Sequence, residues 1–230
     1  MATFVLVHGS CHGGWCWEKI ISLLERHGHN VYTTTLTGLG ERSHLATRDI
    51  GLDTHIIDIT QALEYEHLEI ILVGHSYGGS VISGVAEKVP EIIRRLVYLD
   101  AYILQYNKSA FDIIPGLETI YKQRALKEQD REWLVVSYRP EEFGVTNSVD
   151  INWMNTRLCP MPLHTHQPIR IINPQAKRLS KSYISCIEFG CSQFKAQKSP
   201  SDWDYRELKT GHDAMITVSD KLVQVLEALI

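Results

Sequence analysis

A run of apolar residues that ends in a serine between glycines constrains the fold of this chain more than any other feature. Residues 68–76, LEIILVGHS, predict a buried strand, and residues 78–90, GGSVISGVAEKVP, predict a helix that ends at Pro90. The glycines of G-H-S-Y-G allow a turn between them that is too tight for a side chain. A strand that turns directly into a helix is typical of sheets built from parallel strands.

The alternation of strand and helix continues on both sides of this turn. Glycine and polar clusters separate the segments, and the helical segments carry apolar residues on one face. The predicted strands cover residues 3–9, 29–36, 93–101, 182–189 and 204–211, and the predicted helices cover residues 15–28, 53–66 and 218–230. This order predicts an α/β fold with a mostly parallel, doubly wound sheet, and 230 residues suit a single domain, 1–230.

The alternation stops between about residues 103 and 178. Six prolines and short helical patterns, such as residues 117–136, fill this segment. It is too long for a loop between two strands and too short for an independent core. We therefore expect a mainly helical cap that lies over the sheet, and we call residues 103–178 the insertion.

Composition argues against several other classes of protein. The net charge of −4, without runs of like charge, gives no reason to expect a nucleic-acid or membrane partner. No apolar run is long enough to span a membrane, and residues 1–10 do not read as a signal peptide. The five cysteines are odd in number and match no usual zinc spacing. We expect free thiols, no metal and a cytoplasmic location, with a homodimer as an open alternative.

Ser76 is the candidate nucleophile, because Gly74–Gly78 matches the pattern G-x-S-x-G. The glycines let the chain turn sharply, so that Ser76 Oγ stands at the carboxyl edge of the sheet. The following helix presents free N–H groups and a positive dipole end to a developing anion. A structural turn without chemistry is the alternative, but the strand before and the helix after favour a nucleophile.

A nucleophilic serine needs a general base, and His212 is the best placed of the eleven histidines. It follows the last predicted strand, so its loop reaches the same edge as Ser76, and it comes last in the chain order serine, acid, histidine. His75 adjoins Ser76 and is expected to pack. His164 and His166 could share a metal, but no third ligand is evident. Five other histidines are expected in solvent: His27, His29, His44, His55 and His67.

Three motifs, FVLVHGSCHGGWCW, GHSYGG and TGHDAM, occur in the order and at the separations of a known superfamily. The chain resembles the α/β-hydrolases, and within them the compact group of plant hydroxynitrile lyases, methyl-ester esterases and bacterial relatives. The resemblance covers nearly the whole chain, most weakly in the insertion, and implies that no cofactor is needed. It also implies an oxyanion hole formed by the N–H groups of Ser10 and Tyr77. His8 and His12 are then expected to shape the loop at residues 8–14, whose alternative reading is a plain glycine-rich turn.

Two positions separate the chain from the lyases that it resembles. Those lyases carry threonine where this chain has Gly9, and lysine where it has Asp213. The lysine supplies positive charge for a leaving cyanide, which an aspartate cannot do. The resemblance therefore favours hydrolysis.

The acid that orients His212 is less clearly marked. In the plant relatives it follows the penultimate strand, where this chain has Phe189, which cannot accept a hydrogen bond. Asp100 ends the strand after the nucleophile helix, and the haloalkane dehalogenases are among the α/β-hydrolases that place their acid there. Helix capping is the alternative role for Asp100. Other possibilities stay open: Glu188, which strand geometry turns to the other face, Asp202, Asp204, or no acid at all.

Apolar and aromatic residues of the insertion suggest a hydrophobic pocket. We expect substrate contacts from Trp133, Trp153 and Met161, although simple packing would explain these residues equally well. The chain is thus predicted to be a serine carboxylesterase that cleaves small hydrophobic or aromatic esters through an acyl-enzyme. Two alternatives remain: a protein that binds a small molecule with slow or no turnover, and a lyase or cyclase on the same fold.

Overall fold

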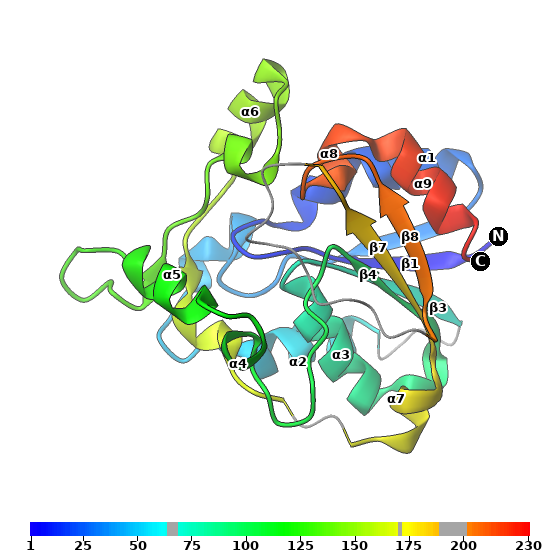
Figure 1. The fold of residues 1–230 in the computed structure, drawn as a ribbon, viewed down its shortest axis with the longest axis horizontal. Coiled ribbons are helices and arrows are strands. Elements are labelled where there is room, and N and C mark those ends of the chain that lie inside the picture. The colour runs from blue at the N-terminus through cyan, green and yellow to red at the C-terminus, as the bar shows by residue number, and fades with distance from the viewer. Residues whose placement is uncertain (64–68, 170–171, 189–201) are drawn as a thin grey trace.

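Six parallel strands form the main sheet of the computed structural model, which describes residues 1–63, 69–169, 172–188 and 202–230 (Figure 1). Their order in space is β2-β1-β3-β4-β7-β8. The strands are β1 (Thr3–Val7), β2 (Asn30–Thr33), β3 (Ile70–His75), β4 (Ile93–Leu99), β7 (Ser180–Cys186) and β8 (Asp204–Leu208). The predicted parallel sheet is confirmed. Every strand ends earlier than predicted.

Helices cover both faces of the sheet, as predicted. One face carries α1 (Glu18–Arg26), α8 (Ala214–Thr217) and α9 (Ser219–Glu227), and the other carries α2 (Leu52–Ala62) and α3 (Gly78–Lys88). Short 3₁₀ turns η1 (Gly14–Trp17), η2 (Gly40–Leu45) and η3 (Pro90–Ile92) connect these elements. None of the helices formed by the described residues has the length and apolar character needed to cross a membrane.

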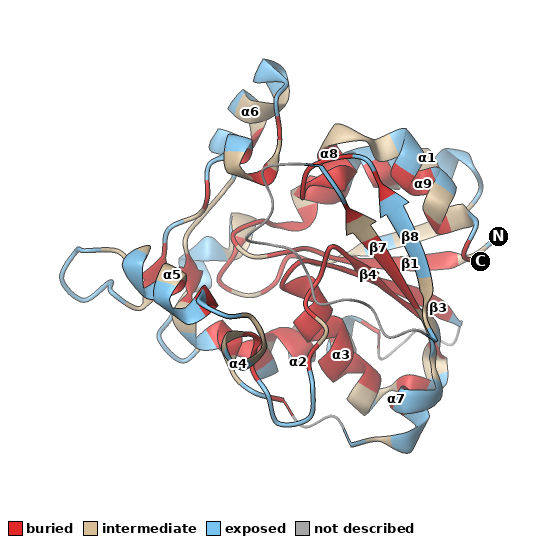
Figure 2. Ribbon diagram, viewed as in Figure 1, coloured by how far each residue is buried: buried red, intermediate tan, exposed pale blue. Residues whose placement is uncertain are grey.

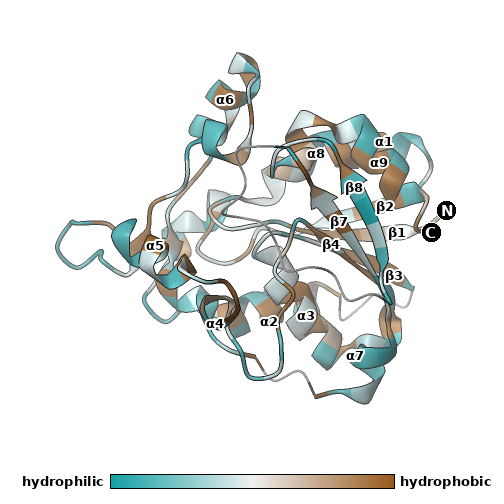
Figure 3. Ribbon diagram, viewed as in Figure 1, coloured by the Kyte–Doolittle hydropathy of each residue, from teal (hydrophilic) through white to brown (hydrophobic). Residues whose placement is uncertain are grey.

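Alternating side chains of each inner strand fill two separate cores. In β1, Phe4 and Leu6 pack with α1 and α9, whereas Val5 and Val7 pack with α2 and α3. Each fully buried side chain of this kind contributes about 1.5–3 kcal/mol through loss of contact with water. The edge strand β8 is mostly exposed and hydrophilic (Figures 2 and 3), and its charged residues oppose pairing with another chain.

The insertion leaves the sheet after β4 and returns to it at β7. Its α4, α5 and α6 lie beyond the carboxyl ends of the strands (Figure 1). It contains α4 (Ala110–Ile113), α5 (Leu117–Gln123), η4 (Pro140–Phe143), α6 (Ser148–Asn155), η5 (Leu163–His166) and α7 (Pro174–Arg178). A two-stranded antiparallel sheet, β5 (Leu134–Val135) with β6 (Met161–Pro162), joins its middle to its end. Two-residue strands leave no periodic pattern, so the sequence did not predict them.

Candidate active site

Ser76 lies at a sharp turn between β3 and α3. Its backbone is left-handed, with φ of 52°, a conformation that costs a residue with a side chain on the order of 1 kcal/mol or more. A Cβ on Gly74 would lie 2.5 Å from the Gly78 carbonyl oxygen, and one on Gly78 would lie 2.6 Å from the Val7 carbonyl oxygen. Only glycine therefore fits on either side of this turn. Ser76 is 5% exposed, so it faces an enclosed site and not open solvent.

His212 and Asp100 meet at the same edge of the sheet. His212 Nδ1 lies 2.6 Å from Asp100 Oδ2, and both residues are buried. The carboxylate accepts the Nδ1 proton, so the imidazole directs the lone pair of Nε2 away from Asp100. Asp100 Oδ1 also accepts a hydrogen bond from the Cys186 N–H at 3.3 Å. These contacts hold the ring in one orientation.

The structure bears on the alternative role of Asp100 as a helix cap and on the other candidate acids. Ser109 and not Asp100 caps α4. Glu188 and Asp202 are exposed, and Asp204 forms an ion pair with Arg206 at 2.9 Å. Phe189, the position that aligns with the acid of the plant relatives, lies outside the described residues.

The two predicted oxyanion donors lie in the turns that follow β1 and β3. Tyr77 is the N-cap of α3, and Ser10 follows Gly9, whose Cα packs so tightly that a Cβ there would lie 3.0 Å from Ser76 Cβ. Among the described residues, no protein group accepts a hydrogen bond from the Ser10 or Tyr77 amide.

His55 was expected in solvent, and that expectation is wrong. It is fully buried, with Nδ1 2.8 Å from the Tyr77 hydroxyl and Nε2 2.8 Å from the Thr37 carbonyl oxygen. Burial lowers the pKa of His55, so the neutral ring donates from Nε2 to Thr37 and accepts the Tyr77 proton at Nδ1. Its position on the inner face of α2 (Ile56 and Ile59 are also buried there) was the signal that could have revealed it.

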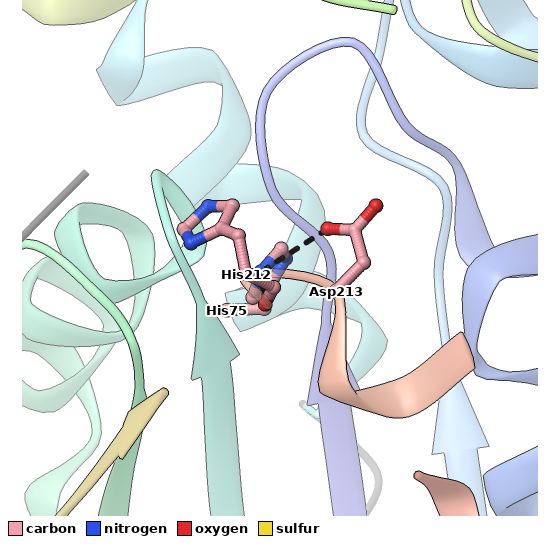
Figure 4. A group of neighbouring side chains, drawn as sticks. All are labelled: His75, His212 and Asp213. Carbon is pink, nitrogen blue, oxygen red and sulfur yellow. Dashed lines mark hydrogen bonds and ion pairs between the residues drawn. The ribbon is translucent and has the colours of Figure 1, made fainter. Parts of the chain in front are cut away.

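Buried His75 and Asp213 lie beside His212 (Figure 4), and His12 completes a cluster with them. His12 Nε2 is 3.1 Å from Asp213 Oδ2, and His75 Nε2 is 3.6 Å from Asp213 Oδ1. Ligand atoms of His75, His212 and Asp213 all lie within 4.8 Å of one another, a spacing that could suit a metal ion. His212 Nδ1 is paired with Asp100, and Asp213 Oδ2 is paired with His12, so contacts within the protein account for this arrangement without a metal. We assign no metal to this cluster.

The H-T-H motif of the insertion does not form a metal site either. His164 is exposed, whereas His166 is buried and stacked on Phe111 with ring centroids 4.7 Å apart. Burial lowers the pKa of His166 to about 3. His166 is therefore a neutral ring in an aromatic core at neutral pH.

The sheet edge and the insertion together line a small cavity. Ser76 and His212 both line it, which places the candidate nucleophile and base on one cavity. The edge of the sheet contributes Ser10, Cys11, His12, His75, Ser76 and His212, and the insertion contributes Tyr121, Val135, Val136, Tyr138 and Phe143. Tyr121 is an addition that the sequence did not indicate, and its hydroxyl lies 3.3 Å from Ser10 Oγ.

The three residues expected to contact substrate lie outside this lining. Trp153 packs edge-on against Trp15, 5.0 Å between ring centroids, and borders an outer groove next to α1. Trp133 donates its indole N–H to the Asp130 carbonyl oxygen at the surface. Met161 is fully buried in the core between the sheet and the insertion. Packing of the insertion, the alternative reading, accounts for where these side chains lie.

Comparison with known proteins agrees with this geometry. Residues 4–179 match the model of the alpha/beta hydrolase family. The chain belongs to this family. A carbendazim hydrolyzing esterase from Nocardioides sp. (strain SG-4G) is 35% identical over the full length of both chains. Methylesterase 1 of Arabidopsis thaliana is 33% identical across 63% of this chain and 53% of its own length. These esterase relatives support a role in ester hydrolysis.

Solved structures of other proteins show the same fold at lower identity. Tomato methylketone synthase I, as a variant complexed with beta-ketoheptanoate, superposes with a TM-score of 0.84 at 20% identity, over 99% of this chain and 97% of its own. A methylesterase from Arabidopsis superposes with a TM-score of 0.78 at 21% identity, over 100% and 98%. At such identities the likeness establishes the fold alone.

Proposed function

We propose that the protein is a serine esterase that cleaves small, uncharged esters through an acyl-enzyme on Ser76. The observation that carries this proposal is the 2.6 Å contact between His212 Nδ1 and Asp100 Oδ2 in a ring that shares its cavity with Ser76. Full-length similarity to an esterase supports it independently.

Each group has a defined part in the proposed reaction. His212 Nε2 takes the proton of Ser76 Oγ as that oxygen attacks the ester carbonyl carbon, and Asp100 stabilises the resulting imidazolium. The Ser10 and Tyr77 amides donate to the oxyanion of the tetrahedral intermediate, each worth about 2.7–4 kcal/mol of barrier. The imidazolium then protonates the departing alkoxide. Water repeats the sequence to release the acid and free Ser76.

The cavity favours a flat, uncharged acyl group. Its walls from the insertion are apolar or aromatic, and none of the described residues that line it is an arginine or lysine. The Phe143 ring lies nearly parallel to His212, 5.9 Å away and tilted by 21°, and so forms a wall beside the reacting groups. We propose aromatic methyl esters and carbamates as substrates, the second class because a relative of 35% identity hydrolyses carbendazim.

Hydrolysis of p-nitrophenyl acetate, methyl benzoate and carbendazim tests the proposal. Ser76→Ala should lower kcat by about 10⁶-fold, the loss typical of a serine nucleophile. Ser80→Ala is the matched control, because this buried serine lies four residues from Ser76 and outside the cavity lining, and it should change kcat less than threefold. Equal rates for the wild type and Ser76→Ala would refute the proposal.

Product analysis separates hydrolysis from the other activities of this fold. An ester should yield alcohol and acid in equal amounts, with a burst of p-nitrophenol and an acetyl group on the peptide that contains Ser76. Saturable binding of these esters without turnover would indicate a binding protein. Carbon–carbon cleavage would indicate a lyase.

A further inference from the structure

The buried ring of His12 contacts a backbone carbonyl oxygen and a carboxyl oxygen. Its Nδ1 lies 2.7 Å from the Ser10 carbonyl oxygen, and its Nε2 lies 3.1 Å from Asp213 Oδ2. The ring is 1% exposed and Asp213 is fully buried, so water cannot substitute for either contact. A neutral imidazole carries only one N–H and could satisfy only one of these oxygens.

The Ser10 carbonyl oxygen can only accept, and the pKa of the Asp213 carboxyl is lowered, so that this group is an ionised acceptor as well. The two contacts then require a proton on each ring nitrogen, which makes His12 an imidazolium and Asp213 a carboxylate. Burial opposes the charged form of His12, but the charge and hydrogen bond of Asp213 outweigh it and raise the pKa of His12. Burial likewise opposes ionisation of Asp213, yet His12 first, and His75 and His212 after it, lower the pKa of that carboxyl. The Trp15 ring stacks on His12 at 5.3 Å and 22°, a geometry that favours a cation.

The pair joins the three turns that carry the proposed reaction. His12 is two residues from the oxyanion donor Ser10, and Asp213 directly follows His212. His75 directly precedes Ser76, donates from Nε2 to the His212 carbonyl oxygen at 3.1 Å, and lies 3.6 Å from Asp213 Oδ1. The oxyanion turn, the nucleophile turn and the base turn thus meet at one carboxylate.

We propose that the buried His12–Asp213 ion pair is a clamp that fixes the oxyanion donor Ser10 against the base His212. His12 and Asp213 are positioning residues, because they act through Ser10 and His212 and not on the ester. The catalytic part of this inference rests on the proposed esterase function. The pair is neutral overall, which is compatible with an uncharged substrate.

The clamp has a defined dependence on pH. The titratable groups that face the pair are His8, Cys16, His75 and His212. Because the pKa of His12 is raised, its charged form persists below that value and is lost as the pH rises through it. One of its two hydrogen bonds must then break. The expected result is a decline of kcat at alkaline pH, where a serine hydrolase with a single neutral histidine base would keep a plateau.

Asp213→Asn removes the charges of the pair while keeping groups that can form both hydrogen bonds. An asparagine amide can donate to Nε2 while Nδ1–H still donates to Ser10, so His12 becomes neutral with its geometry kept. We expect kcat within about fivefold of the wild type at neutral pH, with the alkaline decline abolished. Asp213→Leu breaks both contacts and should lower kcat about 10²-fold with KM changed less than threefold, as for a misplaced catalytic group. A purely structural role would lower kcat in Asp213→Leu but leave the pH profile of Asp213→Asn like that of the wild type.

Nitrogen NMR of the free protein, isotopically labelled at its histidines, provides a test that needs no substrate. The His12 signal, assigned by its absence in His12→Gln, should show protons on both ring nitrogens in the wild type and on one in Asp213→Asn. A neutral His12 in the wild type, or an alkaline decline that survives in Asp213→Asn, would overturn the clamp. Failure of every ester to react would refute the proposed function and the catalytic part of the clamp, while the NMR result would still decide the ion pair.

Discussion

The edge of the sheet supplies most of the polar groups of the site, which hydrogen bonds hold in place, whereas the insertion supplies mainly apolar and aromatic walls, which packing holds in place. Asp100, His212 and His12 each make at least one hydrogen bond of 2.6–2.7 Å at that edge. The lining residues Val135, Val136 and Phe143 contribute no polar side-chain group at all. Directional bonds fix positions closely, while apolar packing tolerates substitution of similar volume. Changes at the sheet edge should therefore affect kcat, and changes in the insertion should affect KM and substrate choice.

Asp100→Asn should produce the largest effect after loss of the nucleophile. An asparagine of the same shape leaves the imidazole in the wrong tautomer, and we expect kcat to fall about 10⁴-fold. Steady-state hydrolysis of p-nitrophenyl acetate measures it. Glu188→Gln is the control, because that carboxylate is exposed, and it should change kcat less than twofold. A larger loss in Glu188→Gln than in Asp100→Asn would reverse the assignment of the acid.

Gly9→Ala should lower kcat on the order of 10²-fold without abolishing folding. The added Cβ would lie 2.9 Å from His75 Nδ1 and 3.0 Å from Ser76 Cβ, so the nucleophile turn must shift by a fraction of an ångström. Overpacking should also cost about 1–3 kcal/mol of unfolding free energy. Kinetics and thermal unfolding of the same sample separate the two effects. An unchanged kcat would show that the turn after β1, which contains Gly9, can shift without moving the turn that contains Ser76.

Phe143→Leu should have a smaller effect that depends on the substrate. Loss of an aromatic wall is worth about 1 kcal/mol, so kcat/KM for methyl benzoate should fall about fivefold, while that for an acetate ester should hardly change. Trp153→Leu is the matched control, because Trp153 packs on Trp15 outside the cavity lining. A larger effect of Trp153→Leu than of Phe143→Leu on kcat/KM for methyl benzoate would contradict the assignment of Phe143 to the substrate cavity.

The sequence predicted the sheet edge better than the insertion for a physical reason. In a parallel sheet the carboxyl ends of all strands lie on one side, so strand order alone placed Ser76, Asp100 and His212 together. No local pattern relates the insertion to that edge. Trp153 and Tyr121 are both aromatic residues of short helices, and only their packing sends one to the outer groove and the other into the cavity. The His12–Asp213 contact joins residues 201 positions apart, and no motif spacing indicated it.

Acid unfolding should distinguish the two regions by an effect on stability and not on catalysis. His8 at the sheet edge and His166 in the insertion both have a pKa lowered by burial to about 3, against about 6.5 in an unfolded chain. Between these values the unfolded state binds more protons, so the unfolding free energy decreases as the pH falls, by about 1.4 kcal/mol per pH unit for each histidine. His166→Phe should remove one such contribution between pH 6 and 4, as measured by denaturant unfolding. His164→Phe, at the exposed partner of the motif, should leave the slope unchanged. Equal slopes for the wild type and His166→Phe would mean that the insertion opens and protonates His166 before the sheet unfolds.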